Sequence, residues 1–469
     1  MDRQQEIIRF GNDGWQSRFD DGFTEENVVR VVDGLGLLWA DSAPGATVYV
    51  GYDTRVGSRL FAETASAVLG SYGLRVRMSD RPCPTPAVGW NCAHDAQAIG
   101  GVIITASDKS CEYGGILIRK SDGGPLRQEF IDDLEQQVSG DATQSRGSYE
   151  LCDLMGNYIE GLLDQVDAQA IRLAAPSVVV DPMYGASSHY LADILRKLGC
   201  QVTEIHAQAM PDFNGLHPIP VDPWADECEQ EVVNRGADLG LILDGDADRA
   251  SAIDHEGNLL SASQLVPLIM RHLVAEKNLS GRVITTLTCS ASIERQASEL
   301  GLTCASVPVG FSRIYREVLE GDVLMGVEEY GGLCLPQHLY ERDGLLACLL
   351  LVELVAQSGQ SLKDLVAEQQ SRLGRMCYKR RDLHLDSAYT QAFRNILPGL
   401  NPPDVAGRAP VEVSHADGLR LTFADGSWVL VRPSRADAVV RLYAEAPTEK
   451  DRDDLLDAVS YLVKNGLPN

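Results

Sequence analysis

Three aspartates at alternate positions form the group of side chains with the clearest chemical potential in this sequence. Asp244, Asp246 and Asp248 follow the apolar run 239–243, which predicts a buried strand that ends where the carboxylates begin. The small residues between the aspartates allow a tight turn in which the three side chains converge. Because the cluster offers only oxygen ligands and three negative charges, it favours a hard divalent cation, Mg2+ before zinc.

Two other interpretations of this acidic loop are a solvated turn and a calcium-binding loop. An EF-hand needs a bidentate glutamate at the end of a loop of about twelve residues. Counted from Asp244, that position is His255, and residues 252–255 read as a second strand instead of a helix. Together with the serine described next, the pattern favours a magnesium site.

Ser107 is the second candidate for chemistry. Residues 100–104 predict a short strand, and the turn after it, Thr105-Ala106-Ser107-Asp108-Lys109, presents a hydroxyl. Most serines at strand ends only cap the next element. Beside a metal ion, however, a serine can exchange a phosphoryl group, because the cation stabilises charge on the transferring oxygens. Ser107 is therefore a candidate phosphoryl carrier.

An ordered set of motifs along nearly the whole chain resembles the α-D-phosphohexomutase superfamily, the phosphoglucomutases and phosphomannomutases. The set contains the family's opening (Phe10–Trp15), its Gly-x-Asp-x-Arg turn (Gly51–Arg55), its phosphoserine loop (Thr105–Ser107), its metal loop (Asp244–Arg249), its sugar-recognition loop (Glu328–Gly332) and its phosphate-binding segment (Arg432–Ser434, then Arg441–Glu445). Any one match could be chance, but the complete set in the right order is a specific signal.

The resemblance implies a phosphate shift between the 1- and 6-positions of a hexose phosphate, through a phosphoserine and a bisphosphorylated sugar. It implies Mg2+ as cofactor and a hexose 1,6-bisphosphate as activator. The site residues that follow from it are the catalytic Ser107, Lys109 and Arg249, the metal ligands Ser107, Asp244, Asp246 and Asp248, and the substrate-binding Glu328, Glu329, Tyr330, Arg432, Ser434 and Arg435.

The chain departs from the family pattern at the positions that handle protons. Asp108-Lys109-Ser110 stands where the family usually has His-Asn-Pro, and Leu117 stands in place of its proton-transferring lysine. Tyr330 replaces the usual serine of the sugar loop, and residues 435–438 replace Gly-Thr-Glu-Pro. Lys109 is the candidate for the missing role, because a cation so close to Ser107 can offset phosphate charge and donate a proton.

Strand, glycine-closed helix and strand recur three times and predict three similar α/β domains with parallel or mixed sheets. The helices are expected at 61–72, 188–198 and 292–300, each followed by a capping glycine. Alternating segments at 381–385, 418–423, 428–432 and 439–445, then helical patterns at 449–462, predict a C-terminal α+β domain. The expected four domains, with the phosphoserine, metal, sugar and phosphate loops in that order, are 1–145, 146–255, 256–372 and 373–469.

The composition is that of a globular protein, with 469 residues, 44% hydrophobic and 23% charged. A net charge of −26 argues against nucleic-acid or anionic-membrane partners. The longest apolar run, 345–352, is too short to span a bilayer. Eleven cysteines without a CxxC pair, and no secretory pattern at the start, predict reduced thiols in a cytoplasmic protein. The nine histidines show no metal-ligand spacing and are expected to be structural or on the surface.

Two classes of function follow from these observations. The first is an active phosphohexomutase that acts on a small sugar phosphate as a monomer or homodimer. The second is a phosphosugar-binding regulator or scaffold that has lost turnover, and a phosphotransferase or phosphatase is a smaller third option. The enzyme is favoured, because three clustered carboxylates without a ligand would destabilise the fold.

Overall fold

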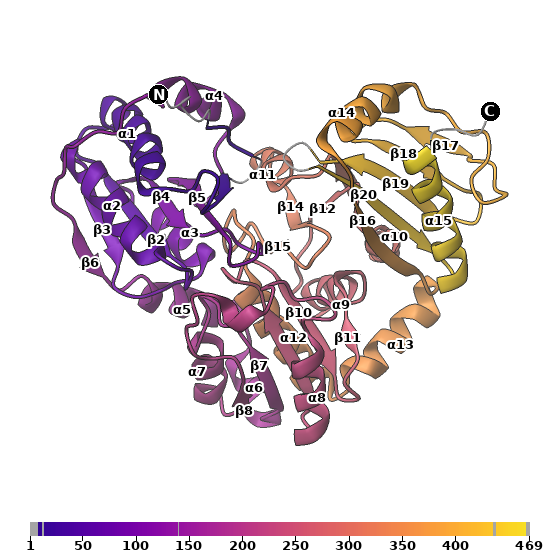
Figure 1. Cartoon of the computed structure of the whole chain (residues 1–469). Coiled ribbons are helices and arrows are strands. Elements are labelled where there is room, and N and C mark those ends of the chain that lie inside the picture. Colours follow the sequence, from indigo (N-terminus) through magenta and orange to yellow (C-terminus); the bar gives the residue numbers. More distant parts are fainter. Residues whose placement is uncertain (1–7, 12–13, 139, 435–437, 466–469) are drawn as a thin grey trace.

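The computed structural model describes residues 8–11, 14–138, 140–434 and 438–465. The chain forms four units that Figure 1 shows in sequence from indigo to yellow, with the first at the left, the second at the bottom, parts of the third in the middle and the fourth at the right. Each unit is built on one sheet. Asn12 and Asp13 of the opening motif, and Arg435 to Asp437 of the phosphate-binding segment, lie outside the described residues.

The first sheet has the strand order β1-β5-β4-β2-β3-β6. Its strands are β1 (Trp15–Arg18), β2 (Thr47–Tyr52), β3 (Arg75–Ser79), β4 (Ala98–Ile104), β5 (Tyr113–Lys120) and β6 (Glu150–Cys152), and its helices are α1 (Glu25–Ser42), α2 (Ser58–Ser71), α3 (Thr85–Ala93) and α4 (Gln128–Gln137). As predicted, β2 and β3 are parallel. Helix α2 begins three residues before the expected start, at Ser58, whose hydroxyl donates to the buried Asp53 carboxylate at 2.6 Å.

The second sheet has the order β11-β10-β9-β7-β8, with β7 and β8 parallel as predicted. Its elements are α5 (Met155–Leu163), α6 (Ala168–Ala174), β7 (Ser177–Asp181), α7 (Tyr190–Lys197), β8 (Gln201–Glu204), the 3-10 turn η1 (Phe213–Gly215), α8 (Asp226–Arg235), β9 (Leu239–Leu243), β10 (Ala250–Asp254) and β11 (Leu259–Leu260). Strand β10 runs antiparallel to β9, so the acidic loop joins two strands and is not an EF-hand.

The third sheet has the order β13-β12-β14-β15, with β12 parallel to both β13 and β14. Its elements are α9 (Ala262–Ala275), β12 (Arg282–Thr286), α10 (Ala291–Glu299), β13 (Cys304–Val307), α11 (Phe311–Leu319), β14 (Val323–Val327), β15 (Leu333–Cys334), α12 (Gly344–Ser358) and α13 (Leu362–Leu373). The capping glycines Gly73, Gly199 and Gly301 after the three repeated helices all have positive φ angles, as expected.

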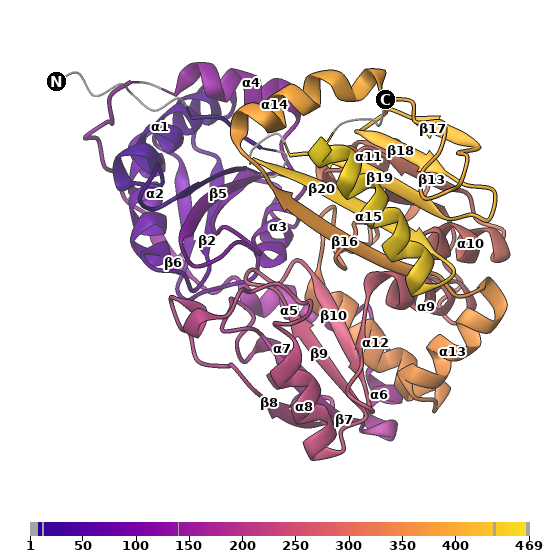
Figure 2. The same ribbon diagram turned by 45° about the vertical axis from the view of Figure 1, so that its right-hand side comes forward.

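The fourth sheet is antiparallel in the order β16-β20-β19-β18-β17. Its elements are β16 (Cys377–His384), α14 (Ser387–Ile396), the 3-10 turn η2 (Leu397–Gly399), β17 (Glu412–Ser414), β18 (Leu419–Thr422), β19 (Trp428–Pro433), β20 (Val439–Ala446) and α15 (Glu449–Asn465). Figure 2 shows α15 lying across this sheet. The predicted fold class, three α/β domains followed by an α+β domain, is confirmed.

The first three units share buried contacts, whereas the fourth has a core of its own. One hydrophobic cluster joins Tyr49 and Leu117 of the first unit to Leu241 of the second and Leu349 of the third. The cluster between α15 and the fourth sheet contains residues from 383 to 463 alone. Among the described residues no single helix could cross a membrane by length and composition, although the bent pair α12 and α13 passes that test together.

Candidate active site

The three predicted metal-binding aspartates lie in the loop between β9 and β10. Asp244, Asp246 and Asp248 are completely buried, and one carboxylate oxygen from each lies within 4.8 Å of the others. Ala247 has a φ of 59°, a left-handed conformation that bends the loop so that the alternate side chains converge. A Cβ at Gly245 would lie 2.6 Å from the Ser107 carbonyl oxygen, so this glycine allows the metal loop and the serine loop to touch.

Ser107 lies directly against this cluster. Its Oγ is 3.5 Å from Oδ2 of Asp244 and accepts a hydrogen bond of 3.0 Å from Nη1 of Arg249. The serine has a φ of 52°, which is uncommon for a residue with a side chain. Thr105 supports this strained turn, because its hydroxyl accepts the Ser107 amide hydrogen bond at 2.9 Å.

The Gly-x-Asp-x-Arg turn after β2 holds the serine loop in place. Arg55 is buried and donates to the backbone carbonyls of Ser107 at 2.6 Å, Lys109 at 2.7 Å and Ser110 at 2.7 Å. Its Nε also donates to Asp53 at 2.9 Å. Five donors in a fixed fork suit arginine for this task. The motif was recognised from the sequence, but its role as a support for the serine loop becomes visible only here.

The donor set fits a divalent cation. In the protein alone, burial and then the charges of Asp248 and Asp246 raise the pKa of Asp244 well above its usual range, and burial and then Asp248 raise the pKa of Asp246 to about 7. Oδ1 of Asp246 is buried and has no hydrogen-bond partner among the described residues. A bound cation would remove the repulsion and supply the missing partner, so the chemistry of these residues suits Mg2+.

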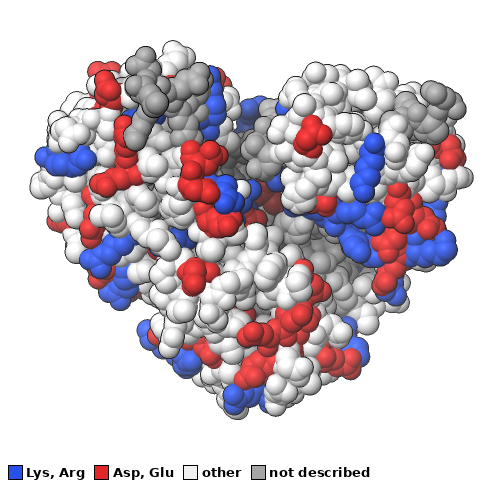
Figure 3. All heavy atoms as spheres, in the orientation of Figure 1, with Lys and Arg blue, Asp and Glu red and all other residues white. Residues whose placement is uncertain are grey.

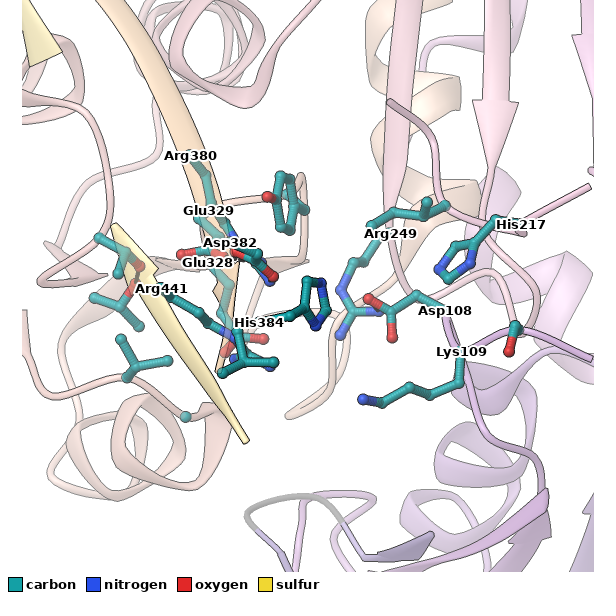
Figure 4. Close-up of a pocket in the computed structure, with 18 of the residues that line it drawn as sticks. Asp108, Lys109, His217, Arg249, Glu328, Glu329, Arg380, Asp382, His384 and Arg441 are labelled. Carbon is teal, nitrogen blue, oxygen red and sulfur yellow. Dashed lines mark hydrogen bonds and ion pairs between the residues drawn. The ribbon is translucent and has the colours of Figure 1, made fainter. Parts of the chain in front are cut away.

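Asp108, Lys109 and Ser110, which follow Ser107, and Arg249, which follows the acidic loop, line a cavity of about 790 Å3 to which all four units contribute. Figure 3 shows the hollow in the surface between the first and fourth units. In Figure 4, Lys109, Asp108, Arg249 and His217 face Arg380 and the other residues of the opposite wall. The lining contains four cationic side chains (Lys109, Arg249, Arg380, Arg441) and four carboxylates (Asp108, Glu328, Glu329, Asp382). The cavity is therefore far less negative than the chain as a whole, as binding of an anion requires.

The predicted sugar loop lies in this wall. Glu328, Glu329 and Tyr330 all line the cavity. Glu328 is paired through Oε2 with Nη1 of Arg342 at 2.6 Å, and Nη2 of Arg342 lies 2.6 Å from Oδ2 of Asp248. The sugar loop and the acidic loop are thus joined by one buried arginine.

The structure does not bring the predicted phosphate anchor into the cavity lining. Nε of Arg432 donates to Asp417 at 2.8 Å. Ser434 is buried, and its carbonyl accepts a hydrogen bond from Arg394. Arg432 lies directly opposite Arg441 in the β19–β20 register, and Arg441 does line the cavity. Arg435 lies outside the described residues.

Among the acidic, basic and histidine side chains of the lining, four were not singled out from the sequence, namely Arg380, Asp382 and His384 of β16 and His217 of the loop before α8. The first three alternate along one strand, so the period of two could have placed them on one face. Only 381–385 was predicted as a strand there, which excluded Arg380. His217 and His384 line the cavity, so the expectation that all nine histidines are structural or on the surface remains an untested prediction for these two.

The residues that replace the family's proton-transfer groups have different environments. Leu117 is 1% exposed and packs in the shared core, so it takes no part in the site. Burial would raise the pKa of Asp108, but Arg249 and then Lys109 hold it below its usual range. Burial, and then the charges of Arg55 and Lys109, lower the pKa of His217 against the opposing effect of Asp108.

Comparison with known proteins finds matches to three successive domains of one family. Models of the phosphoglucomutase/phosphomannomutase alpha/beta/alpha domains I, II and III match residues 8–145, 156–257 and 261–373. A phosphoglucomutase/phosphomannomutase of Thermococcus kodakarensis is 29% identical over 98% of this chain and 99% of its own. A probable phosphoglucosamine mutase of Methanothermobacter thermautotrophicus is 30% identical over 94% of each chain.

Solved structures show the same architecture. A putative phosphomannomutase from Thermus thermophilus superposes with a TM-score of 0.89 and 30% identity, over 98% of this chain and all of that one. The N-acetylphosphoglucosamine mutase of Aspergillus fumigatus, solved with GlcNAc-6P and magnesium, superposes with a TM-score of 0.59 over 99% of this chain and 97% of that one. At 13% identity, the second match shows the fold alone.

Proposed function

Because this chain belongs to the phosphoglucomutase/phosphomannomutase family, we propose that it moves a phosphoryl group between the 1- and 6-positions of a hexose phosphate. Its relatives are mutases over nearly its full length, and the chain is an intramolecular phosphotransferase. The observation that carries the finer proposal is the contact of Ser107 with Asp244 and with Arg249, the latter a residue of the cavity lining. A hydroxyl so placed can carry a phosphoryl group and deliver it to a bound sugar.

In the proposed reaction, phosphoserine 107 gives its phosphoryl group to the free hydroxyl of a sugar phosphate. The oxygen–phosphorus bond to Ser107 breaks and a bond to the sugar oxygen forms. The sugar hydroxyl gives up a proton and the freed Ser107 oxygen takes one up, so the serine hydroxyl is restored. The bisphosphorylated sugar then turns in the cavity, and the phosphate from its other end returns to Ser107. Loss of the bisphosphate would leave an unphosphorylated enzyme, so added hexose 1,6-bisphosphate should act as the activator.

The protein's own groups supply position and charge for this transfer. Arg249 already donates to Ser107 Oγ and can follow the phosphoryl oxygens as charge moves onto the sugar. Arg55 and Thr105 keep the serine loop fixed, so little reorganisation is needed. Mg2+, held by Asp244, Asp246, Asp248 and an oxygen of Ser107 or its phosphate, would neutralise negative charge on the phosphoryl group.

Proton transfer is assigned to Lys109. Its ammonium group lies on the cavity side of the serine loop, 5.5 Å from the centre of the Tyr113 ring (Figure 4). Glu328, Glu329 and Tyr330 would contact the sugar hydroxyls. The segment predicted to bind the distal phosphate, with Arg432, Ser434 and Arg435, would do so through Arg441, its residue in the cavity lining. Arg441, opposite Arg432, extends this basic surface into the cavity.

A coupled assay with glucose, mannose and glucosamine 1-phosphates, in the presence of Mg2+ and glucose 1,6-bisphosphate, tests the proposal. Ser107→Ala should abolish turnover and remove the phosphate that peptide mapping finds on the wild type. Ser110→Ala, a serine of the same loop that also lines the cavity, is the matched control and should retain both. Phosphate on another peptide, or full activity of Ser107→Ala, would refute the assignment. Binding without turnover would favour the regulatory or scaffold role instead.

A further inference from the structure

Arg380 joins the fourth unit to the sugar loop of the third. Its Nη1 donates to Oε1 of Glu329 at 3.0 Å, while its Nε and Nη2 each donate to an oxygen of Asp382 at 2.6 Å. The guanidinium carbon lies 5.3 Å from the centre of the Tyr330 ring and 5.8 Å from that of Tyr443. Two carboxylates and two aromatic rings therefore fix this side chain, which points into the cavity wall in Figure 4.

The two neighbouring glutamates of the sugar loop have different partners. Glu328 is tied through Arg342 to Asp248 of the acidic loop. Glu329 is tied to Arg380 of the fourth unit, and its Oε2 is buried without a hydrogen-bond partner among the described residues. Glu329 itself lines the cavity, and a carboxylate with an unsatisfied oxygen is a strong acceptor for a donor that arrives with a ligand. A sugar hydroxyl is such a donor.

We propose that Arg380 is a positioning residue for substrate: it orients Glu329 for a sugar hydroxyl and couples that contact to the placement of the fourth unit. The inference rests on the proposed function, because it assigns a role within the same substrate cavity. Without Arg380, the carboxylates of Glu329 and Asp382 would repel each other and an anionic substrate. Because the fourth unit has a separate core, polar contacts of this kind determine how it meets the sugar loop.

The chemistry of the contact distinguishes arginine from lysine at this position. A guanidinium can hold both oxygens of Asp382 along one edge, reach Glu329 with its remaining nitrogen and stack on Tyr330. An ammonium group is a point charge that cannot do all of these together. The aromatic ring of Tyr330, at a position where the family usually has serine, supplies part of this stack. Arg380→Lys should therefore keep the charge and the fold but lose much of the effect on substrate.

A double-mutant cycle on Glu329→Gln and Arg380→Met tests the coupling. In saturating Mg2+ and glucose 1,6-bisphosphate, each single variant should raise KM for the preferred sugar 1-phosphate by about 10- to 100-fold, with a smaller change in kcat. If Arg380 acts through Glu329, the KM of the double variant should be close to that of each single variant. Arg381→Met is the matched control, since the neighbouring Arg381 pairs with Asp457 and Ser460 away from the cavity.

Two further variants keep the test decisive. Tyr330→Ser, which removes the ring beside the Arg380 guanidinium, should raise KM for the sugar 1-phosphate. If Arg380→Met does not fold, Arg380→Lys takes its place in the cycle. Additive effects of the two changes, or an equal effect of Arg381→Met, would refute the role of Arg380.

Calorimetric titration with glucose 1,6-bisphosphate separates this proposal from the proposed function. If the bisphosphate binds, the effects of Glu329→Gln and Arg380→Met on its affinity are non-additive and no sugar phosphate is turned over, the mutase assignment is refuted and the positioning role of Arg380 is supported. Turnover together with additive effects of the two substitutions on KM would refute only the positioning role of Arg380. A wild type that neither binds nor reacts would refute both.

Discussion

Replacing Asp246 with asparagine should stabilise the metal-free protein and weaken the magnesium-loaded one. Without a cation, burial and then the charge of Asp248 raise the pKa of Asp246 to about 7, from an ordinary value of 3.8. A rise of about three pH units corresponds to about 4 kcal/mol that the folded protein loses when this carboxylate ionises. Asparagine has nearly the same shape and no charge. In EDTA at pH 8 the variant should therefore be more stable by up to a few kcal/mol.

The repulsion at Asp246 also predicts how the stability of the metal-free protein changes with pH. Between about pH 4 and pH 7, the folded metal-free wild type keeps a proton that the unfolded chain has released, so its stability should fall as the pH rises through this interval. The variant should lack the share of this fall that comes from Asp246. In Mg2+ the wild type should be the more stable of the two proteins, because cation binding stabilises the folded state and the variant offers the cation one negative charge fewer.

Urea denaturation at several pH values, with EDTA and with Mg2+, measures both effects. Asp193→Asn is the matched control, because Asp193 is an exposed carboxylate of the same unit, on α7, where it pairs with Arg196. It should change neither the EDTA stability nor the response to Mg2+ appreciably. A variant at Asp246 that is less stable than the wild type in EDTA, or that gains as much from Mg2+, would refute the charge-repulsion account and with it the cation site.

Other perturbations test the supports of the serine and the transfer of the proton. Arg55→Met leaves a buried carboxylate unpaired and should cost about 3–5 kcal/mol in urea denaturation, whereas the exposed Arg59→Met should cost little. Leu117→Lys should not restore the family's proton transfer in the coupled assay, and should destabilise the protein by several kcal/mol because a charge enters the core. Lys109→Met should slow turnover by about 100- to 10,000-fold if Lys109 moves the proton. If His217 is the base instead, His217→Gln should have that effect and remove an acidic limb below pH 6.5 from the rate profile, since burial lowers the pKa of this histidine.

Local patterns in the sequence were sufficient to predict the fold class, and they singled out Ser107 and the acidic loop, which the structure brings together. Apolar runs that end in Ser107 and Asp244 predict two strand ends, and in α/β sheets such ends meet ligands. The glycine caps at Gly73, Gly199 and Gly301 follow from backbone sterics that act within one turn of a helix. The acidic loop, its preference for an oxygen-binding cation and the antiparallel C-terminal sheet depend on neighbours in the chain, so they could be predicted from the sequence.

Only the tertiary structure decided which distant residues share the cavity. Arg380 reaches Glu329 across 51 positions of sequence, and Arg55 holds the carbonyl of Ser107 across 52. Neither pairing leaves a periodic trace, because it depends on how elements distant in the sequence pack, within one unit for Arg55 and between two for Arg380, and not on the spacing within one element. The same holds for His217, which looks like a loop histidine in the sequence and lies in the cavity wall. Side-chain types and local spacing thus determined what chemistry the chain can support, while long-range packing decided which groups are close enough to perform it.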